Sequence, residues 1–217
     1  MLELGFNAAT PARRILCLGA HCDDIEIGMG ATLMRLAKSN PEAQFRFVVL
    51  TGNETRDDET RHAFRQLLPP TTRYELTIER FRNGHFPYVA TDVKARIEAE
   101  KDFEPELIFT HYRNDHHQDH RTVSELTANT FRNHLVFEYE ILKYDGDLAN
   151  PNVFAAITKE QLDYKIDALM QSFASQLDKQ WFTPDVFEAM ARIRGVHAAS
   201  PTGFAEAFFA RKLTVAF

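Results

Sequence analysis

Apolar and polar residues follow two different periods along this chain. Short runs rich in Ile, Leu, Val and Phe are typical of buried strands, and the segments between them have the pattern and composition of helices. The predicted strands are residues 14–18, 45–51, 73–78, 106–110 and 137–143. The predicted helices are residues 31–38, 57–68, 91–101, 120–134, 159–179 and 184–194, while the segment 205–215 fits a helix or a strand.

The order of these elements predicts the fold class. Strands and helices alternate over the first two thirds of the chain, which indicates an α/β fold with a mostly parallel sheet and helices on both faces, as in Rossmann-like proteins. No repeat or linker interrupts the pattern, and 217 residues suffice for one well-buried domain but not for two. We therefore expect a single domain over residues 1–217.

Composition and charge exclude several classes of protein. A net charge of −6 argues against a nucleic-acid-binding domain, which usually carries a basic stripe. No run of roughly 18 apolar residues is present, so no membrane span is expected. The two cysteines, Cys17 and Cys22, are expected to lie too far apart for a disulfide across a strand and its turn. Free thiols favour a reducing compartment, and we expect a cytoplasmic protein.

Two polar stretches follow directly after predicted strands. One is Ala20-His21-Cys22-Asp23-Asp24, and the other is residues 111–120, which hold four of the nine histidines of the chain. In parallel α/β sheets, ligands bind outside the carboxyl ends of the strands. Imidazoles and carboxylates concentrated at such ends are typical of a metal site. A solvated surface turn is the alternative for the second stretch taken alone.

The residue types narrow the kind of metal site. Histidine and carboxylate without thiolate favour Zn²⁺, Fe²⁺ or Mn²⁺ in a reactive site, because structural zinc sites are usually rich in cysteine. Two loops can supply three ligands and leave a carboxylate and an imidazole over. Those are the base and the acid that hydrolysis needs.

At these residues the chain resembles the LmbE-like, or PIG-L, family of zinc-dependent deacetylases. The family signature Ala-His-Pro-Asp-Asp is similar to residues 20–24, and its second signature, Asn-Asp-x-His-x-Asp-His, is matched by residues 114–120. Weaker similarities are Arg56-x-x-Glu59 after the second strand, and Arg194-Gly195 with Ala205-Glu206-Ala207-Phe208 near the end. The resemblance implies removal of an acetyl group from an N-acetylglucosamine-type sugar or its conjugate, with release of acetate.

The resemblance also implies roles for individual residues. His21, Asp24 and His120 would hold the Zn²⁺ ion, for which Fe²⁺ is a substitute, and Asp23 would be the general base. His117 would protonate the leaving amine or stabilise the oxyanion, with Asp119 orienting its ring. Two further residues are candidates for substrate binding, each with a structural alternative: Arg56 as an ordinary residue of a helix N-terminus, and Asn114 as a helix cap.

One position departs from the family pattern, since Cys22 stands where proline is usual. A small side chain directed into the core is the favoured interpretation, with a metal-binding or oxidisable thiol as the alternative. Arg194 is interpreted as a structural ion-pair partner ahead of a substrate contact. His111 and His116 are interpreted as supporting or solvent-facing residues ahead of ligands.

Two other functions stay open from the residues alone. Asp115-His116-His117 resembles the name motif of DHH-type phosphoesterases, but that family also expects a glycine-rich motif, and this chain has no Gly-Gly pair. A non-catalytic metal- or sugar-binding module is the third hypothesis, and the presence of both Asp23 and His117 argues against it. The expected partner is a small N-acetylated sugar or sugar conjugate, and the sequence does not distinguish between particular sugars. Association into a homo-oligomer is compatible with the sequence.

Overall fold

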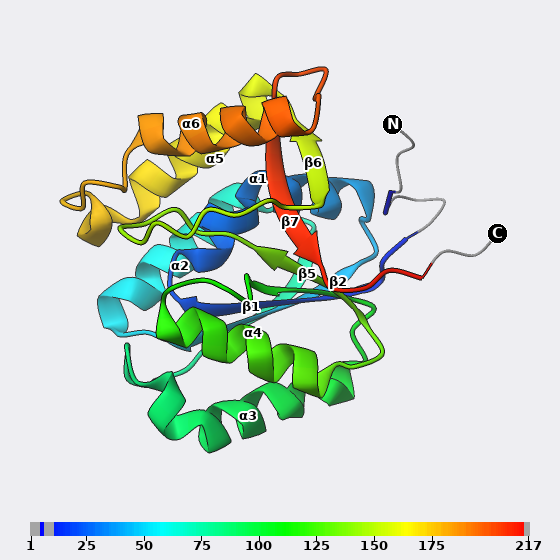
Figure 1. Ribbon diagram of the computed structural model, residues 1–217, viewed down its shortest axis with the longest axis vertical. Coiled ribbons are helices and arrows are strands. Elements are labelled where there is room, and N and C mark those ends of the chain that lie inside the picture. The colour runs from blue at the N-terminus through cyan, green and yellow to red at the C-terminus, as the bar shows by residue number, and fades with distance from the viewer. Residues whose placement is uncertain (1–4, 7–10, 215–217) are drawn as a thin grey trace.

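The computed structural model describes residues 5–6 and 11–214, which form a single α/β domain around one seven-stranded sheet (Figure 1). The strands lie in the order β3-β2-β1-β4-β5-β7-β6. All neighbouring pairs from β3 to β5 are parallel, and β7 is antiparallel to both β5 and β6. The strands are β1 (Arg14–His21), β2 (Gln44–Thr51), β3 (Arg73–Ile78), β4 (Leu107–His111), β5 (Leu135–Tyr139), β6 (Val153–Ile157) and β7 (Phe204–Ala210).

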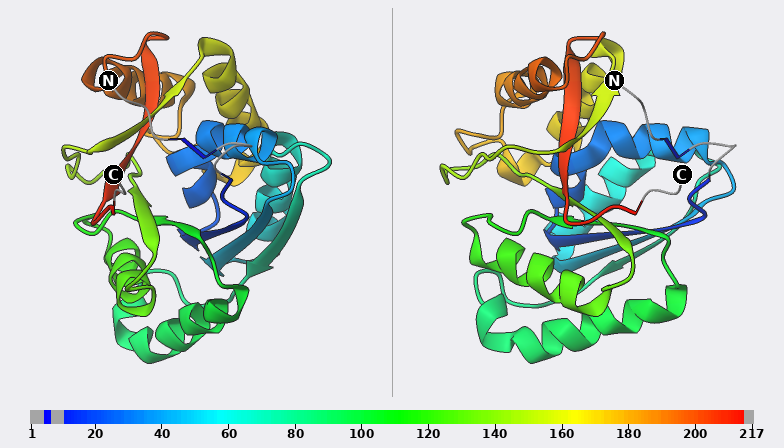
Figure 2. Two further views of the ribbon diagram at one scale, coloured as in Figure 1. Left: turned by 90° about the vertical axis from the view of Figure 1, so that its right-hand side faces the viewer. Right: turned by 45° about the vertical axis from the view of Figure 1, so that its right-hand side comes forward.

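Helices cover both faces of the sheet, as the sequence predicts. Helices α3 and α4 lie on one face, and α1, α2, α5 and α6 lie on the other (Figures 1 and 2). The α-helices are α1 (Asp24–Ser39), α2 (Glu54–Leu67), α3 (Ala90–Glu98), α4 (Gln118–Thr130), α5 (Lys159–Ser172) and α6 (Pro184–His197), and three 3₁₀ turns are η1 (Phe86–Val89), η2 (Ala99–Phe103) and η3 (Ala174–Gln176). None of the helices in the described ranges has the length and apolarity needed to cross a bilayer.

Alternation along β1 divides the core into two layers. Ile15 and Cys17 point to the side of α1 and α2, and Leu16 and Leu18 point to the side of α3 and α4. Both layers are closely packed, because these four side chains are inaccessible to solvent. A strand buried on both faces is continuously apolar, which is why β1 and β2 were readable from sequence.

Several boundaries differ from the predictions. Helix α1 begins at residue 24 and not at 31, because Gly28 and Gly30 lie inside the helix instead of in a turn before it. The predicted helix 159–179 ends at residue 172, where Phe173 leaves helical geometry (φ −103°, ψ 58°). The ambiguous segment 205–215 is a strand only as far as Ala210, the end of β7, and Val215 lies outside the described residues. Strand β6 was not predicted. Its short, half-buried run carries too weak a pattern.

The strand order reverses between β1 and β4, which are neighbours in the sheet although β2 follows β1 in the chain. Connections from these two strands leave in opposite directions, and their carboxyl ends face a common crevice. Both polar stretches found in the sequence lie there, since β1 ends at His21 and β4 ends at His111.

Candidate metal centre

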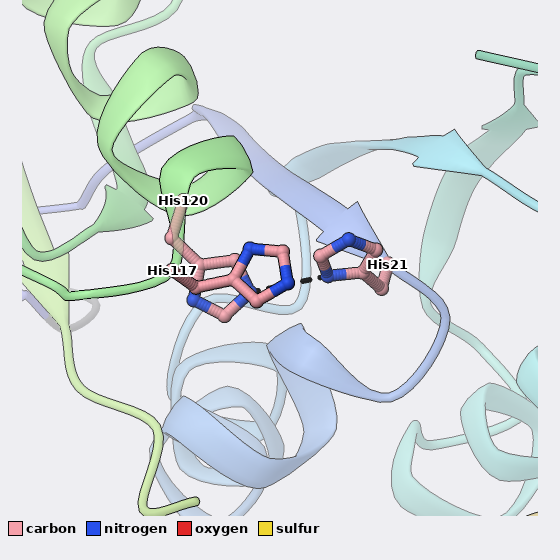
Figure 3. Close-up of side chains that lie close together, drawn as sticks. All are labelled: His21, His117 and His120. Atoms are coloured by element: carbon pink, nitrogen blue, oxygen red, sulfur yellow. Dashed lines mark hydrogen bonds between the residues drawn. The ribbon is translucent and has the colours of Figure 1, made fainter. Parts of the chain in front are cut away.

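The three predicted metal ligands meet at this crevice. His21 ends β1, Asp24 begins α1, and His120 lies in the first turn of α4. His21 Nδ1 is 3.1 Å from His120 Nε2 and 3.4 Å from Asp24 Oδ2, and His120 Nε2 is 3.5 Å from Asp24 Oδ1. Figure 3 shows the ring of His21 facing those of His117 and His120. We refer to His21, Asp24 and His120 as the donor cluster.

The donor cluster fits a divalent cation. A tetrahedral zinc ion with bonds near 2.1 Å separates its ligand atoms by about 3.4 Å, which agrees with the spacings in the donor cluster. Burial raises the pKa of Asp24, but the imidazoles of His120, His111 and His21 outweigh burial and hold that pKa well below its usual value. An ionised carboxylate between imidazole nitrogens is a donor set typical of Zn²⁺ or Fe²⁺.

Supporting carboxylates hold both imidazoles of the donor cluster. Asp115 Oδ2 lies 2.9 Å from His120 Nδ1, on the far side of the ring from the cluster. Asp119 Oδ2 lies 3.2 Å from His21 Nε2, and the same carboxylate accepts hydrogen bonds from the backbone N–H groups of Gly84 (2.6 Å) and Phe86 (3.0 Å). A carboxylate on the second nitrogen fixes the tautomer and the orientation of a metal-binding histidine.

The structure corrects the expectation for Asp119. The family resemblance implied that its side chain orients His117, but the carboxylate is bonded to His21 and to the loop 84–86. The backbone N–H of Asp119 is the group that reaches His117, donating to Nδ1 over 3.2 Å. This follows from the helix start, since His117 is the N-cap of α4 and accepts an amide of its first turn.

His117 lies close to the donor cluster, and its ring contacts that of His21 at 4.8 Å between centroids. Donor atoms of His21, His117 and His120 lie within 4.8 Å of one another, so distance alone would also allow His117 as a ligand. Burial lowers the pKa of His117 to about 4, helped by the neighbouring His120 and His21. With Nδ1 accepting a backbone hydrogen, the neutral ring carries its proton on Nε2.

Asp23 stands next to the donor cluster in a constrained backbone conformation. Its φ of 104° is in the left-handed region, which aspartate tolerates better than most residues. Burial raises the pKa of Asp23 to about 6, against the opposing effect of Arg56, whose Nη2 lies 2.8 Å from Oδ2. A buried carboxylate with a pKa near neutrality has the properties of a general base.

The guanidinium of Arg56 is engaged in contacts within the protein. Its terminal nitrogens donate to Asp23 and the carbonyl of Cys22, and to Glu59 and Ser175 at 2.8 and 3.1 Å. The guanidinium also lies over the ring of Phe173. This arrangement favours a role in holding the residue 22–23 turn over the predicted substrate contact.

The remaining candidates are placed as follows. Asn114 is exposed and donates to the hydroxyl of Tyr112 (3.1 Å). Cys22 is a buried free thiol whose pKa burial raises to about 12, and Cys17 is also free.

Arg194 forms a two-point ion pair with Glu140, which confirms the structural interpretation. His111 is fully buried and accepts the backbone N–H of Ala20 (2.9 Å), whereas His116 is exposed.

Sequence reasoning missed two contributors to the site. The sequence gives no expectation of a contact between Asp115 and His120, although their spacing of five residues across a helix start allows one. Lys143, which lies 2.8 Å from Asp115 Oδ1, carried no signal because it comes from a different loop, after β5.

Comparison with known proteins supports the same fold and family. The uncharacterized deacetylase YaiS of Escherichia coli K12 is 29% identical over 181 residues, which cover 75% of this chain and 92% of YaiS. The N,N′-diacetylchitobiose deacetylase from Pyrococcus horikoshii superposes with a TM-score of 0.69 at 20% identity, covering 92% of this chain and 84% of that chain. GalB, the 4-carboxy-2-hydroxymuconate hydratase of Pseudomonas putida KT2440, has a TM-score of 0.73 at 18% identity, covering 94% and 98%.

The two structural likenesses establish the fold and not the reaction, since one of these proteins is named a deacetylase and the other a hydratase. The family match is more specific. Residues 16–131 match the family described as GlcNAc-PI de-N-acetylase (PIG-L), and this range contains both polar stretches. Because the match spans more than half of the chain, this protein belongs to the PIG-L family of deacetylases.

Proposed function

We propose that the protein is a zinc-dependent deacetylase that removes the acetyl group from an N-acetylglucosamine-type sugar or its conjugate and releases acetate. The observation that carries this proposal is the buried Asp23 carboxylate, held by Arg56 beside the three residues of the donor cluster, whose nitrogen and oxygen atoms approach one another to 3.1–3.5 Å. The family match and the sugar deacetylase of the same fold support the choice of substrate class over the phosphoesterase alternative.

His21, Asp24 and His120 are the residues that would hold the metal. When bound there, Zn²⁺ or Fe²⁺ supplies a Lewis acid for the amide carbonyl and lowers the pKa of water. Asp115 and Asp119 keep the two imidazoles oriented for this purpose. The free cysteines agree with the cytoplasm as the expected compartment.

Asp23 would take the proton from the attacking water. With a pKa near 6 it is ionised at neutral pH, yet basic enough to accept a proton in the transition state. Arg56 keeps the carboxylate in place, and its charge prevents a further rise of that pKa.

His117 would stabilise the carbonyl oxygen as negative charge develops on it. Its Nδ1 accepts the Asp119 amide, so the neutral ring offers Nε2–H as a donor. The proton that Asp23 has accepted from the water would then be passed to the nitrogen of the leaving sugar amine. Collapse of the tetrahedral intermediate breaks the C–N bond and yields acetate and the free amine.

The test combines metal analysis with acetate release from a panel of N-acetylated sugars and sugar conjugates. We expect Asp23→Asn to retain the metal and to lose about 10²-fold or more in turnover, as expected for a missing general base. The matched control is Asp58→Asn, an exposed aspartate on α2. Acetate release by Asp23→Asn at the wild-type rate, or no acetate from any substrate with the metal bound, would contradict the proposal.

A further inference from the structure

Helix α1, which carries Asp24, is interrupted one turn after its start. Met29 has φ −150° and ψ 19°, outside helical geometry, and it divides α1 into a short first segment (residues 24–28) and a longer second segment (residues 30–39). Asp23 is the N-cap of the first segment, so the proposed base and one proposed metal ligand both belong to it.

A buried ion pair fills the interruption. Lys165 Nζ, from α5, donates to the carbonyl oxygen of Ile27 (2.6 Å) and contacts Glu206 Oε1 (2.6 Å), from β7. Glu206 Oε1 accepts the N–H of Ala31 (3.1 Å), and Oε2 accepts that of Thr32 (2.6 Å). In an uninterrupted helix, the Ile27 carbonyl and the Ala31 amide would pair with each other.

The signs of the two charges match the two helix ends they meet. Lys165 lies at the carbonyl end of the first segment, where a cation is favourable, and Glu206 lies at the amide end of the second, where an anion is favourable. The pair therefore supplies the hydrogen bonds that the break leaves unmade. Burial of an ion pair by itself contributes little to stability, so this arrangement calls for another role.

The first segment is also packed tightly on its other side. A Cβ on Gly28 would lie 2.4 Å from the ring of Tyr139, and the hydroxyl of Tyr139 donates to the Leu18 carbonyl of β1 (2.6 Å). At the break, a Cβ on Gly30 would lie 3.2 Å from Lys165 Cγ. The first segment is thus fixed between Tyr139 and Lys165 and cannot shift without disturbing one of them.

We propose that Lys165 and Glu206 are positioning residues that hold α1 open at Met29 and thereby set where Asp23 and Asp24 stand relative to His21 and His120. This inference rests on the proposed function, because it concerns the geometry of the metal ligands. The inference assigns a positioning role to the Ala205-Glu206-Ala207-Phe208 motif, which lies outside the candidate metal centre.

The chain offers a matched control in a second buried ion pair. Arg194 Nε and Nη2 contact the Glu140 carboxylate at 2.6 and 2.7 Å, and Arg194 and Glu140 line the same small cavity as Lys165 and Glu206. The other hydrogen bond described for the Arg194 side chain is with His197, on its own helix. The two pairs are alike in burial and charge, but the hydrogen bonds to the α1 backbone come from Lys165 and Glu206.

The experiment compares Lys165→Met/Glu206→Gln with Arg194→Met/Glu140→Gln, so that neither variant leaves an unpaired buried charge. The Zn²⁺ affinity of each is measured by competition with a chromogenic chelator, and the geometry of the site by the visible spectrum of the Co²⁺ form. We expect the first variant to bind Zn²⁺ about 10–100-fold more weakly, as when supporting contacts of a metal ligand are lost, and to change the Co²⁺ spectrum. The control should keep the wild-type affinity and spectrum.

Equal affinities in the two variants and the wild type, or an equal loss in both variants, would overturn the inference while leaving the proposed function intact. A wild-type protein that binds no metal would instead overturn the proposed function. Should the first double variant not fold, Glu206→Asp keeps the charge and withdraws the carboxylate from the α1 amides by one methylene. It should weaken Zn²⁺ binding relative to its control, Glu140→Asp, and equal affinity in these two would overturn the inference.

Discussion

Two groups of potential metal ligands meet at Asp115, and they differ in whether a positive charge already lies among their ligand atoms. The donor cluster of His21, Asp24 and His120 presents imidazoles around a carboxylate. The aspartate cluster of Asp115, Asp145 and Asp147 has the spacing of a cation site too, but Lys143 Nζ already lies 2.8 Å from Asp115, 2.9 Å from Asp147 and 3.8 Å from Asp145. Ligand spacing alone therefore does not identify a metal site; the charge that already occupies it must be counted.

The largest expected effect is the loss of bound metal when a ligand of the donor cluster is removed. We expect His120→Ala to lose stoichiometric Zn²⁺ after dialysis, with a fall in affinity beyond the roughly 10–100-fold caused by loss of a supporting contact. Asp147→Asn is the matched change in the aspartate cluster and should leave the metal content unchanged. Elemental analysis provides the measurement, and one metal per chain in His120→Ala would remove His120 from the ligand set.

His117 lies beside the donor cluster, close enough to His21 and His120 to bind the same metal, but its tautomer presents Nε2–H, which is a hydrogen-bond donor. We expect His117→Ala to retain Zn²⁺ and to lower kcat for deacetylation by about 10²–10³-fold, the range for loss of one hydrogen-bond donor to the developing oxyanion. The exposed neighbour His116→Ala serves as the control. Loss of the metal from His117→Ala would show a ligand in place of a catalytic group.

Asp115, a member of the aspartate cluster, also contacts the donor cluster, with one carboxylate oxygen on His120 and the other on Lys143. Replacement by asparagine removes the charge that supports His120, so we expect Zn²⁺ binding to weaken by about 10–100-fold. Asp145→Asn, at the outer edge of the aspartate cluster, should bind Zn²⁺ as the wild type does. Chelator competition measures both, and equal affinities would show that Asp115 serves the aspartate cluster alone.

Arg56 contacts Asp23 as Lys143 contacts Asp115. Replacing Arg56 should have the smallest effect, a shift in the pH dependence of activity. Asp23 must be ionised to act as a base, so activity should be present above pH 6 and fall as the pH drops through about 6. In Arg56→Met the opposing charge is gone, the pKa of Asp23 rises, and the acidic limb of the pH–rate profile should move up by about one unit. An unmoved limb, or one equal to that of the exposed-residue control Arg65→Met, would argue against this pairing.

The sequence was sufficient to predict the elements whose signal is local. Continuous apolar runs identified β1, β2 and β4, and the density of imidazoles identified the loop before α4. The placement of His21, Asp24 and His120 around one point follows from the parallel order of β1 and β4, which the alternation of strands and helices predicts.

Contacts between distant segments were not predictable in the same way. Lys143 and Asp115 come from loops after different strands, and Lys165 and Glu206 meet α1 from α5 and β7. The break at Met29 was visible only as two glycines, and their composition alone suggested a turn outside the helix. Such features depend on which charges the finished fold brings together, and no local pattern encodes that.

The place of β7 in the sheet has a consequence for the timing of assembly during protein synthesis. This strand lies between β5 and β6, so β6 cannot join the sheet until β7 has been synthesised. His21, Asp24 and His120 emerge long before that, but Glu206 arrives with β7. A nascent chain would thus display the ligands before the strand that fixes their helix, and we expect tight metal binding to follow the addition of β7 to the sheet.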